Sequence, residues 1–320
     1  MSNDPIPFRL VRRGERPDPA HARQQLASRD GATRLRSHED AASDYVLDHR
    51  LETAVNMALA VGEPLLVTGG PGTGKTQLAY FLGWYFDIEV RPFHVKSTST
   101  ARDLKWEFDA VGYLQSAYAA AHGGTGKTRA DFLERGPLWE AYEDSAPSVL
   151  LIDEIDKAPR DFPNDLLHEL DQGWFYHPFD RNATGGPLRV PREESERRPI
   201  IVITSNVERQ LPAPFLRRCV FHHIELTEAL VKQAVDARAS KGAFPHLAPD
   251  VQQRAIERFW DLRPPACDLQ KPPATGELLV WLAILNAQGI ALDALAAPLH
   301  ELPCIGALVK DHGDMAKLKT

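Results

Sequence analysis

The chain has 320 residues, a formal net charge of −7 at pH 7, 43% hydrophobic residues and 25% charged residues. These proportions are typical of a globular protein and exclude a chain that is disordered over most of its length. At about 100–200 residues for each domain, the length allows one large domain or two smaller ones.

The sequence also argues against several kinds of site and location. Its three cysteines, Cys219, Cys267 and Cys304, have no CxxC spacing, so we expect free thiols rather than disulfides or a zinc site. The longest strongly apolar run, Leu278–Leu285, is far shorter than the ~18–20 residues that span a bilayer. The N-terminal stretch lacks the apolar core of a secretory signal, so we expect a cytoplasmic protein with no membrane partner.

Residues 1–44 are predicted to form a flexible basic arm, because they show little apolar periodicity. Met1–Arg36 contains eight arginines against four acidic residues, a local charge of +4. A solvated tail is the commoner structure for such a run, and contact with an acidic partner or nucleic acid is the alternative. The acidic balance of the whole chain argues against nucleic acid, since sequence-independent binding draws on a basic surface.

From residue 45 to residue 227, short apolar runs alternate with helical patterns. This alternation predicts an α/β domain with a mainly parallel sheet. The strands are expected at Pro64–Thr68, Val90–Val95, Ser148–Ile152, Pro199–Thr204 and Cys219–Leu226. The helices are expected at Leu51–Ala60, Gln77–Tyr85, Pro137–Glu143 and Phe162–Leu170.

Residues 228–320 are predicted to form a smaller, all-helical second domain. The pattern there no longer contains strand-like runs, and prolines separate the helical segments. These helices are expected at Glu228–Ala239, Pro249–Leu262 and Glu277–Leu285.

A glycine-rich motif fits GxxxxGK(S/T) and stands between an expected strand and an expected helix, the context that a P-loop requires. Backbone N–H groups of such a loop surround phosphate oxygens, and the helix directs its positive end towards them. Lys75 is expected to reach the β- and γ-phosphates, and the Thr76 hydroxyl to ligate Mg²⁺. The predicted ATP-binding residues are Gly69, Gly70, Pro71, Gly72, Thr73, Gly74, Lys75, Thr76 and Gln77.

A second glycine-rich run, Gly123–Thr128, repeats only the tail of this motif. Ala121 stands where the first glycine is needed, and no apolar strand precedes the run. We therefore expect an exposed loop that does not bind phosphate.

The segment Val149–Glu154 predicts a buried strand that ends in two adjacent carboxylates. Asp153 is expected to hold Mg²⁺, and Glu154 to polarise the water that attacks the γ-phosphate. Such a pair alone is more often a solvated turn, but the P-loop upstream favours the catalytic interpretation.

Two further segments carry candidate catalytic residues. Asn206 follows the strand Pro199–Thr204 and could bond the attacking water or the γ-phosphate; a strand-end cap is the alternative. Arg217 and Arg218 end a short helical segment. Arginine stabilises charge on a transferring phosphoryl group, although a solvated pair is the alternative.

Together these motifs resemble those of AAA+ ATPases, and LLIDEIDKAPRDFPNDLLHELD with ITSNVERQLPAPFLRRC is similar to the MoxR-like group. The resemblance covers about residues 45–310. It implies a P-loop αβα core, a helical lid and a homo-oligomeric ring, usually a hexamer, with nucleotide between neighbours. By this resemblance Arg218 matches the arginine finger best, with Arg217 as the alternative. Lys271 falls at the sensor 2 position, which is often arginine in the family.

The resemblance implies Mg²⁺-dependent ATP hydrolysis that remodels, matures or assembles a partner protein complex. Members of the MoxR-like group often act with a partner that carries a von Willebrand factor A domain. Two alternatives stay open: an ATP-dependent regulatory switch and a nucleic-acid-dependent motor. Leu170–Arg198 contains an aromatic run and is a candidate for an inserted hairpin that faces the ring centre or a partner. Core packing is the usual role of an aromatic run and is the alternative. The loop Ser97–Arg102 is a second candidate for the pore side of the ring.

Overall fold

The computed structural model describes residues 18, 20, 37–122, 127–144, 146–181, 185–191, 198–206 and 208–319. They form two compact units. The first, here the sheet unit, comprises Leu47–Gly70 and Lys75–Glu225. The second, here the helical unit, comprises Leu226–Thr320 together with Pro71–Gly74 and the described part of Met1–Val46.

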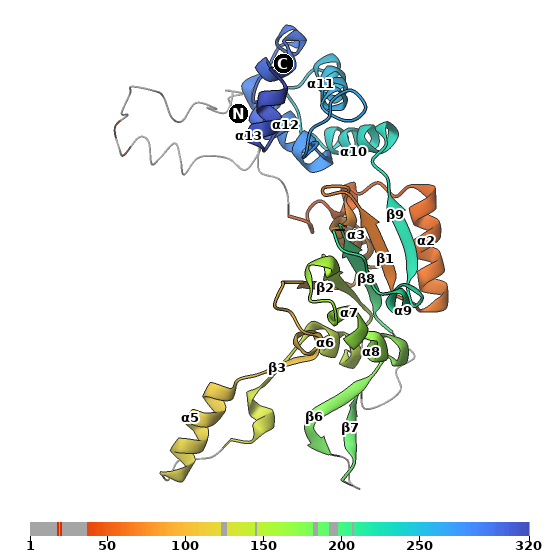
Figure 1. The fold of residues 1–320 in the computed structure, drawn as a ribbon, viewed down its shortest axis with the longest axis vertical. Coiled ribbons are helices and arrows are strands. Elements are labelled where there is room, and N and C mark those ends of the chain that lie inside the picture. The colour runs from red at the N-terminus through yellow and green to blue at the C-terminus, as the bar shows by residue number, and fades with distance from the viewer. Residues whose placement is uncertain are drawn as a thin grey trace. The chain divides into compact units, whose positions relative to one another are not determined.

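The sheet unit is built on five parallel strands in the spatial order β2-β5-β8-β1-β9 (Figure 1). Non-consecutive neighbours in this order require crossover connections, as expected for an α/β sheet. The five predicted strands are confirmed to within two residues at each end. Their bounds are β1 Leu65–Gly69, β2 Glu89–His94, β5 Ser148–Asp153, β8 Ile200–Ser205 and β9 Val220–Ile224.

The register of the strands brings their carboxyl ends to one edge. Asp153 at the end of β5 is paired with His94 at the end of β2, and Thr68 of β1 with Ser205 of β8. Polar residues that follow the apolar strands in the sequence are therefore collected at this edge, as in other open α/β sheets.

Helices cover both faces of the sheet. α2 (His49–Val61) and α3 (Lys75–Phe86) pack on one face, where α3 contacts β1, β5 and β8. On the other face, alternate strand residues such as Leu66, Leu150 and Ile203 join a fully buried cluster. The short helices that contribute to this cluster are α4 Ala101–Lys105, α6 Pro137–Glu143, α7 Phe162–Asp165, α8 Leu167–Gln172 and α9 Ala213–Leu216.

The single helix predicted at Phe162–Leu170 is wrong, because α7 and α8 are separate. The division falls at Leu166, whose backbone angles of φ −91° and ψ −10° depart from α-helical values while its side chain is fully buried. The helical pattern is therefore present on both sides of Leu166 and interrupted at this one residue.

The sequence did not predict an insert between β2 and β5. It begins at α4 (Ala101–Lys105), which a capping box of Thr100 and Asp103 starts. The predicted loop Ser97–Arg102 therefore ends in the first turn of this helix. Two three-residue strands pair antiparallel, and the helix between them has no buried residue. The remaining elements are β3 Trp106–Phe108, α5 Ala110–Ala121, η3 Arg129–Phe132 and β4 Leu133–Arg135.

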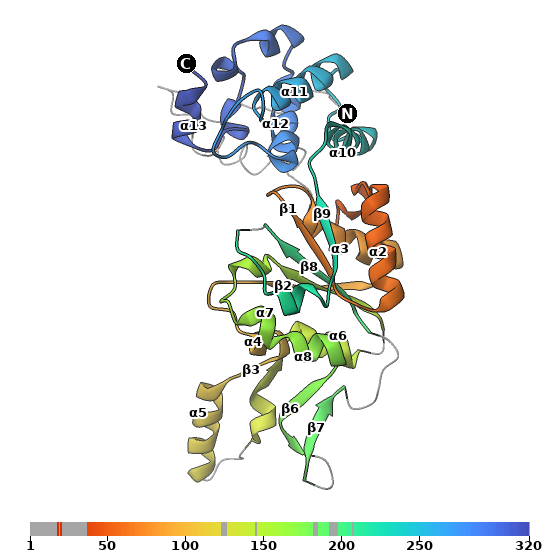
Figure 2. The same ribbon diagram turned by 45° about the vertical axis from the view of Figure 1, so that its right-hand side comes forward.

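A second insert, within Leu170–Arg198, is an antiparallel hairpin of β6 (Phe175–Arg181) and β7 (Pro187–Val190). Figure 2 shows both inserts extending away from the five-stranded sheet. They contact each other, since the ring centre of Phe179 lies 5.1 Å from that of Phe108 and 6.2 Å from that of Trp106.

The helical unit packs around α12 (Thr275–Gln288), in which Leu278, Trp281 and Leu285 are fully buried. The three predicted helices are present and run somewhat longer or shorter than predicted. The other helices of this unit are α10 Glu228–Ser240, α11 Pro249–Asp261 and α13 His312–Lys317, with short 3₁₀ turns η5 Leu292–Ala296, η6 Leu299–Glu301 and η7 Ile305–Ala307.

The described end of the predicted basic arm, residues 37–44, contains a turn and η2 (Ala42–Asp44). The carboxylate of Asp44 is buried and lies 2.5 Å from the Lys241 ammonium. Most of the predicted arm lies outside the described residues. No helix in the described part of the chain has the length and apolar character needed to cross a membrane.

Candidate nucleotide site

The loop after β1 brings Lys75 back onto its own backbone. The Lys75 Nζ donates hydrogen bonds to the carbonyl oxygens of Gly69 and Gly70, at 2.9 and 2.8 Å. Only 5% of the Lys75 residue surface is exposed, and burial lowers the pKa of its ammonium, although the Asp153 carboxylate acts in the opposite direction. A buried cation whose partners are neutral carbonyls is well suited to bind an anion.

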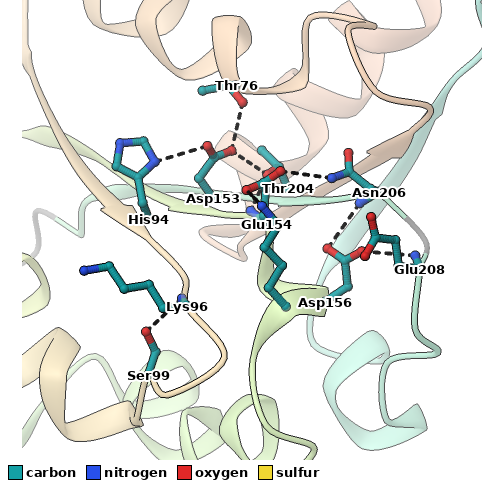
Figure 3. Close-up of polar contacts among 11 residues, drawn as sticks. Thr76, His94, Lys96, Ser99, Asp153, Glu154, Asp156, Thr204, Asn206 and Glu208 are labelled. Atoms are coloured by element: carbon teal, nitrogen blue, oxygen red, sulfur yellow. Dashed lines mark hydrogen bonds and ion pairs between the residues drawn. The ribbon is translucent and has the colours of Figure 1, made fainter. Parts of the chain in front are cut away.

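Asp153 is the centre of a polar cluster at the carboxyl edge of the sheet (Figure 3). The hydroxyl groups of Thr76 and Thr204 donate to its Oδ1, at 2.8 and 2.7 Å. The Nδ1 atom of His94 lies 3.3 Å from its Oδ2. The structure thus brings together Thr76 and Asp153, the two residues predicted to bind metal.

Glu154 lies beside Asn206, as Figure 3 shows. The Asn206 Nδ2 donates to Glu154 Oε1 at 3.1 Å, and the Lys157 ammonium is paired with Oε2. The hydrogen bond from Lys157 to Glu154 raises the pKa of that ammonium. The backbone of Glu154 adopts the left-handed conformation, at φ 59°, which is uncommon for a residue with a side chain and is frequent at functional sites.

Thr204 and Asp156 connect the segment of Asp153 and Glu154 to the segment of Asn206, and neither residue was predicted from the sequence. The Thr204 hydroxyl accepts the backbone N–H of Glu154 at 2.8 Å while it donates to Asp153. Asp156 is 3% exposed and accepts the backbone N–H groups of Asn206 and Glu208, at 3.2 and 3.0 Å. The available signal was a polar residue at the end of each predicted strand, but the sequence does not show which residues pair.

The cluster offers the oxygen ligands that Mg²⁺ prefers, a hydroxyl of Thr76 and a carboxylate of Asp153. The described residues contain no group of three or more His, Cys, Asp or Glu side chains that could hold a metal ion. A cation here would therefore depend on phosphate and water oxygens for most of its ligands, as Mg²⁺ does in nucleotide sites.

The two candidate arginines make no hydrogen bond or ion pair with this cluster among the described residues. Arg218 instead pairs with Asp171, Nε to Oδ2 at 2.5 Å, and Arg217 is exposed at the end of α9. Lys271 is exposed in the helical unit, where its backbone N–H donates to Asp314 at 2.9 Å.

The remaining predicted nucleotide-binding residues divide between the two units. Pro71, Gly72, Thr73 and Gly74 belong to the helical unit, and Gln77 lies in the first turn of α3. Gly72 and Gly74 have φ values of 69° and 89°, which residues with a Cβ atom rarely adopt. The roles of these residues and of Lys271 stay predictions.

The second glycine-rich run lies mostly outside the described residues, at 123–126. Its Lys127 is exposed, and the Lys127 ammonium lies 5.8 Å from the ring centre of Phe132. The described part of this run therefore contacts the insert rather than the Asp153 cluster.

A family profile described as AAA domain (Cdc48 subfamily) matches residues 63–254, the span that holds the P-loop and the polar cluster. The chain therefore belongs to this AAA family. It has the P-loop αβα fold of AAA+ proteins, binds nucleotide and is an ATPase.

The chain matches no curated protein. Among solved structures it is similar to a provisionally assigned ATPase from Cytophaga hutchinsonii ATCC 33406, at 13% identity over 78% of this chain and 77% of the other. The TM-score of that pair is 0.38.

Proposed function

We propose that the chain is an Mg²⁺-dependent ATPase of the MoxR-like group, and that its ring remodels, matures or assembles a partner protein complex. The observation that carries the catalytic part is the adjacency of Asp153 and Glu154 to Thr76 and Asn206. Three segments that are far apart in the sequence thus bring a metal-ligand pair and a base–amide pair to one sheet edge.

In this proposal ATP and water give ADP and phosphate. Lys75 exchanges its carbonyl partners for phosphate oxygens, and Thr76 and Asp153 ligate Mg²⁺, which when bound neutralises phosphate charge. Glu154 accepts the proton of the attacking water, which Asn206 orients. The contacts with Lys157 and Asn206 use one acceptor site on each Glu154 oxygen, and the side chain is 35% exposed, so a water can still bond the carboxylate.

Arg218 is proposed as the arginine finger that acts on the nucleotide of a neighbouring subunit, in a homo-oligomer that is a hexameric ring by family resemblance. Its side chain is 41% exposed, which supports a role at an intersubunit contact. A cation from the neighbour would stabilise charge on the transferring phosphoryl group.

Lys271 is proposed to serve as sensor 2. The segment 45–227 is proposed to be the AAA+ core, and the segment 228–320 its lid.

The two inserts are the proposed contact region for the partner, which by resemblance carries a von Willebrand factor A domain. On α5 the large apolar side chains Val111, Leu114 and Tyr118 are 67%, 62% and 70% exposed. Exposed apolar residues grouped on one helix commonly mark a protein-binding surface. A cytoplasmic location belongs to this proposal and follows from the sequence expectation.

Steady-state phosphate release tests the proposal against its two alternatives. The purified protein should hydrolyse ATP with Mg²⁺ and stop when EDTA removes it, and a client protein should stimulate turnover. A switch would give slow turnover but a large change in partner affinity between ATP and ADP. A nucleic-acid motor would be stimulated by DNA or RNA instead.

Capture of partners with Glu154→Gln protein in ATP identifies the client. The variant should hold ATP and retain a partner that Lys75→Ala protein, used in parallel, does not retain. Equal retention by both variants contradicts ATP-driven partner binding.

A further inference from the structure

The guanidinium of Arg218 is anchored on one edge and free on the other. Its Nε donates to Asp171 Oδ2 at 2.5 Å, and its Nη1 donates to the carbonyl oxygen of Pro214 at 3.1 Å. Within the described part of the chain, Nη2 has no hydrogen-bond partner. The guanidinium is therefore held through Nε and Nη1 while its Nη2 donors stay available.

Arg217 differs from its neighbour in this respect. It is exposed, and among the described residues its side chain makes no hydrogen bond or ion pair. A free arginine loses side-chain entropy when a phosphate orders it, whereas an arginine that is already held loses less. The pairing with Asp171 thus distinguishes the two candidates physically.

Asp171 is itself held in place. It lies in the last turn of α8, two residues before Gly173, which ends the helix at φ 71° and leads into the β6–β7 hairpin. Its backbone carbonyl accepts a hydrogen bond from Arg198 Nη1 at 3.5 Å. The carboxylate that anchors Arg218 therefore projects from a helix end rather than from a free loop.

We propose that Asp171 is a positioning residue for ATP hydrolysis, which acts by holding Arg218 in the orientation that meets the nucleotide of the neighbouring subunit. This inference rests on the proposed function, since it requires Arg218 to act on the neighbour. Asp171 itself touches neither nucleotide nor water. Its effect comes from orientation, because a small misplacement of a catalytic group costs rate steeply.

The first test compares Asp171→Ala and Asp171→Asn with Asp165→Ala as control. Asp165 is an exposed carboxylate on the adjacent α7 whose side chain makes no hydrogen bond or ion pair within the described residues. Asp171→Ala should lower kcat about 10-fold or more, because Arg218 is displaced. The KM for ATP should change little, because the residues that bind ATP in the variant subunit are unchanged. Asp171→Asn keeps an oxygen acceptor for Nε and should stay within about 3-fold of wild type.

The second test is subunit mixing with Lys75→Ala protein. In a mixed ring, a Lys75→Ala subunit can present a well-positioned Arg218 to the intact ATP site of an Asp171→Ala subunit, so activity should recover in part. A defect confined to the ATP site of the Asp171→Ala subunit would not recover. The double variant Asp171→Ala/Arg218→Ala should be no slower than Arg218→Ala, because both changes remove the same action.

Three outcomes overturn the inference. The first is a kcat of Asp171→Ala equal to that of the Asp165→Ala control. The second is an increased kcat of Asp171→Ala, which would mean that Asp171 sequesters Arg218. The third is no recovery of activity in mixtures of Asp171→Ala and Lys75→Ala that are shown to co-assemble. Normal turnover by Arg218→Ala would refute both the arginine assignment and this inference. If Arg218→Ala turns over slowly and is rescued by subunit mixing while Asp171→Ala turns over normally, this inference is refuted and the arginine assignment stands.

Discussion

The Thr76 hydroxyl donates a hydrogen bond of 2.8 Å to Asp153 Oδ1 across 77 positions of the sequence. The hydroxyl lies in the first turn of α3 and the carboxylate at the end of β5. A cation that takes both oxygens as ligands would break this bond, since the hydroxyl hydrogen must then turn away. The hydrogen bond therefore joins α3 to the end of β5, and coordination of both oxygens to Mg²⁺ would take its place.

Lys75→Ala should abolish ATP binding while the protein stays folded. The change removes a buried ammonium that two carbonyl oxygens orient, and phosphate binding depends on that charge. Titration with a fluorescent ATP analogue measures the loss, and circular dichroism checks the fold. Lys127→Ala, in the second glycine-rich run, is the matched control and should bind ATP like wild type; an equal loss there would contradict the expectation that this run does not bind phosphate. Normal ATP binding and hydrolysis by Lys75→Ala would refute the P-loop assignment.

Glu154→Gln should bind Mg-ATP and hydrolyse it about 10²–10⁴-fold more slowly, which is the usual contribution of a general base. The amide keeps a hydrogen-bond acceptor for Asn206 but cannot take a proton at neutral pH. Single-turnover phosphate release, measured beside ATP binding, separates the two effects. Wild-type turnover by this variant would exclude Glu154 as the base.

Specific ATPase activity should rise with protein concentration, because a finger supplied by the neighbour contributes about 10³–10⁵ in rate. Arg218→Ala should bind ATP and hardly hydrolyse it. Mixing Arg218→Ala with Lys75→Ala subunits should restore part of the activity, since one interface then has an intact loop and an intact arginine. A monomer with a concentration-independent rate would contradict a shared site.

Asp156→Ala should reduce both stability and kcat. It leaves the partly buried backbone N–H groups of Asn206 and Glu208 without their acceptor, a loss of about 1 kcal/mol or more in the free energy of unfolding. Urea unfolding measures the loss, and kcat at constant KM reports displacement of Asn206. The control is Asp161→Ala, an exposed carboxylate with no side-chain capping bond, which should match wild type in both measurements.

Cys219 should resist alkylation in the folded protein. Burial raises the pKa of its thiol to about 12, and its Sγ lies 3.5 Å from the carbonyl oxygen of Phe215. The thiol is then neutral at pH 8.5, where an unfolded cysteine with pKa near 8.5 is about half ionised. Iodoacetamide labelling followed by mass spectrometry should show slow modification of Cys219, and fast labelling after denaturation.

The raised pKa of Cys219 also predicts how the free energy of unfolding changes at high pH. Because the folded pKa is raised, the stabilising contribution of the neutral thiol is complete below the unfolded pKa and is lost as the pH rises towards 12. Cys219→Ala should remove this part of the alkaline loss. Rapid labelling of native Cys219 at pH 8.5 would contradict the buried environment.

The motifs themselves could be predicted from the sequence, since each is local. The glycine-rich run before Lys75 and the apolar strand before Asp153 are continuous in the chain, and their physical requirements are visible in a few neighbouring residues. The strands β1, β5 and β8 were predicted for the same reason, because buried parallel strands are nearly continuous apolar runs. The insert was missed because β3 and β4 have three residues each, too few to show a period, and α5 has no buried face.

The sequence by itself determined the P-loop, the acidic strand end, and thereby the ATPase class of this protein. Only the tertiary structure decided how the site is connected: Thr204 bridges Asp153 and Glu154, Asp156 holds the backbone at Asn206, and Asp171 anchors Arg218. Each of these links joins residues 47–51 positions apart. Strand order and register create such contacts, and no local pattern in the chain encodes which polar residue meets which.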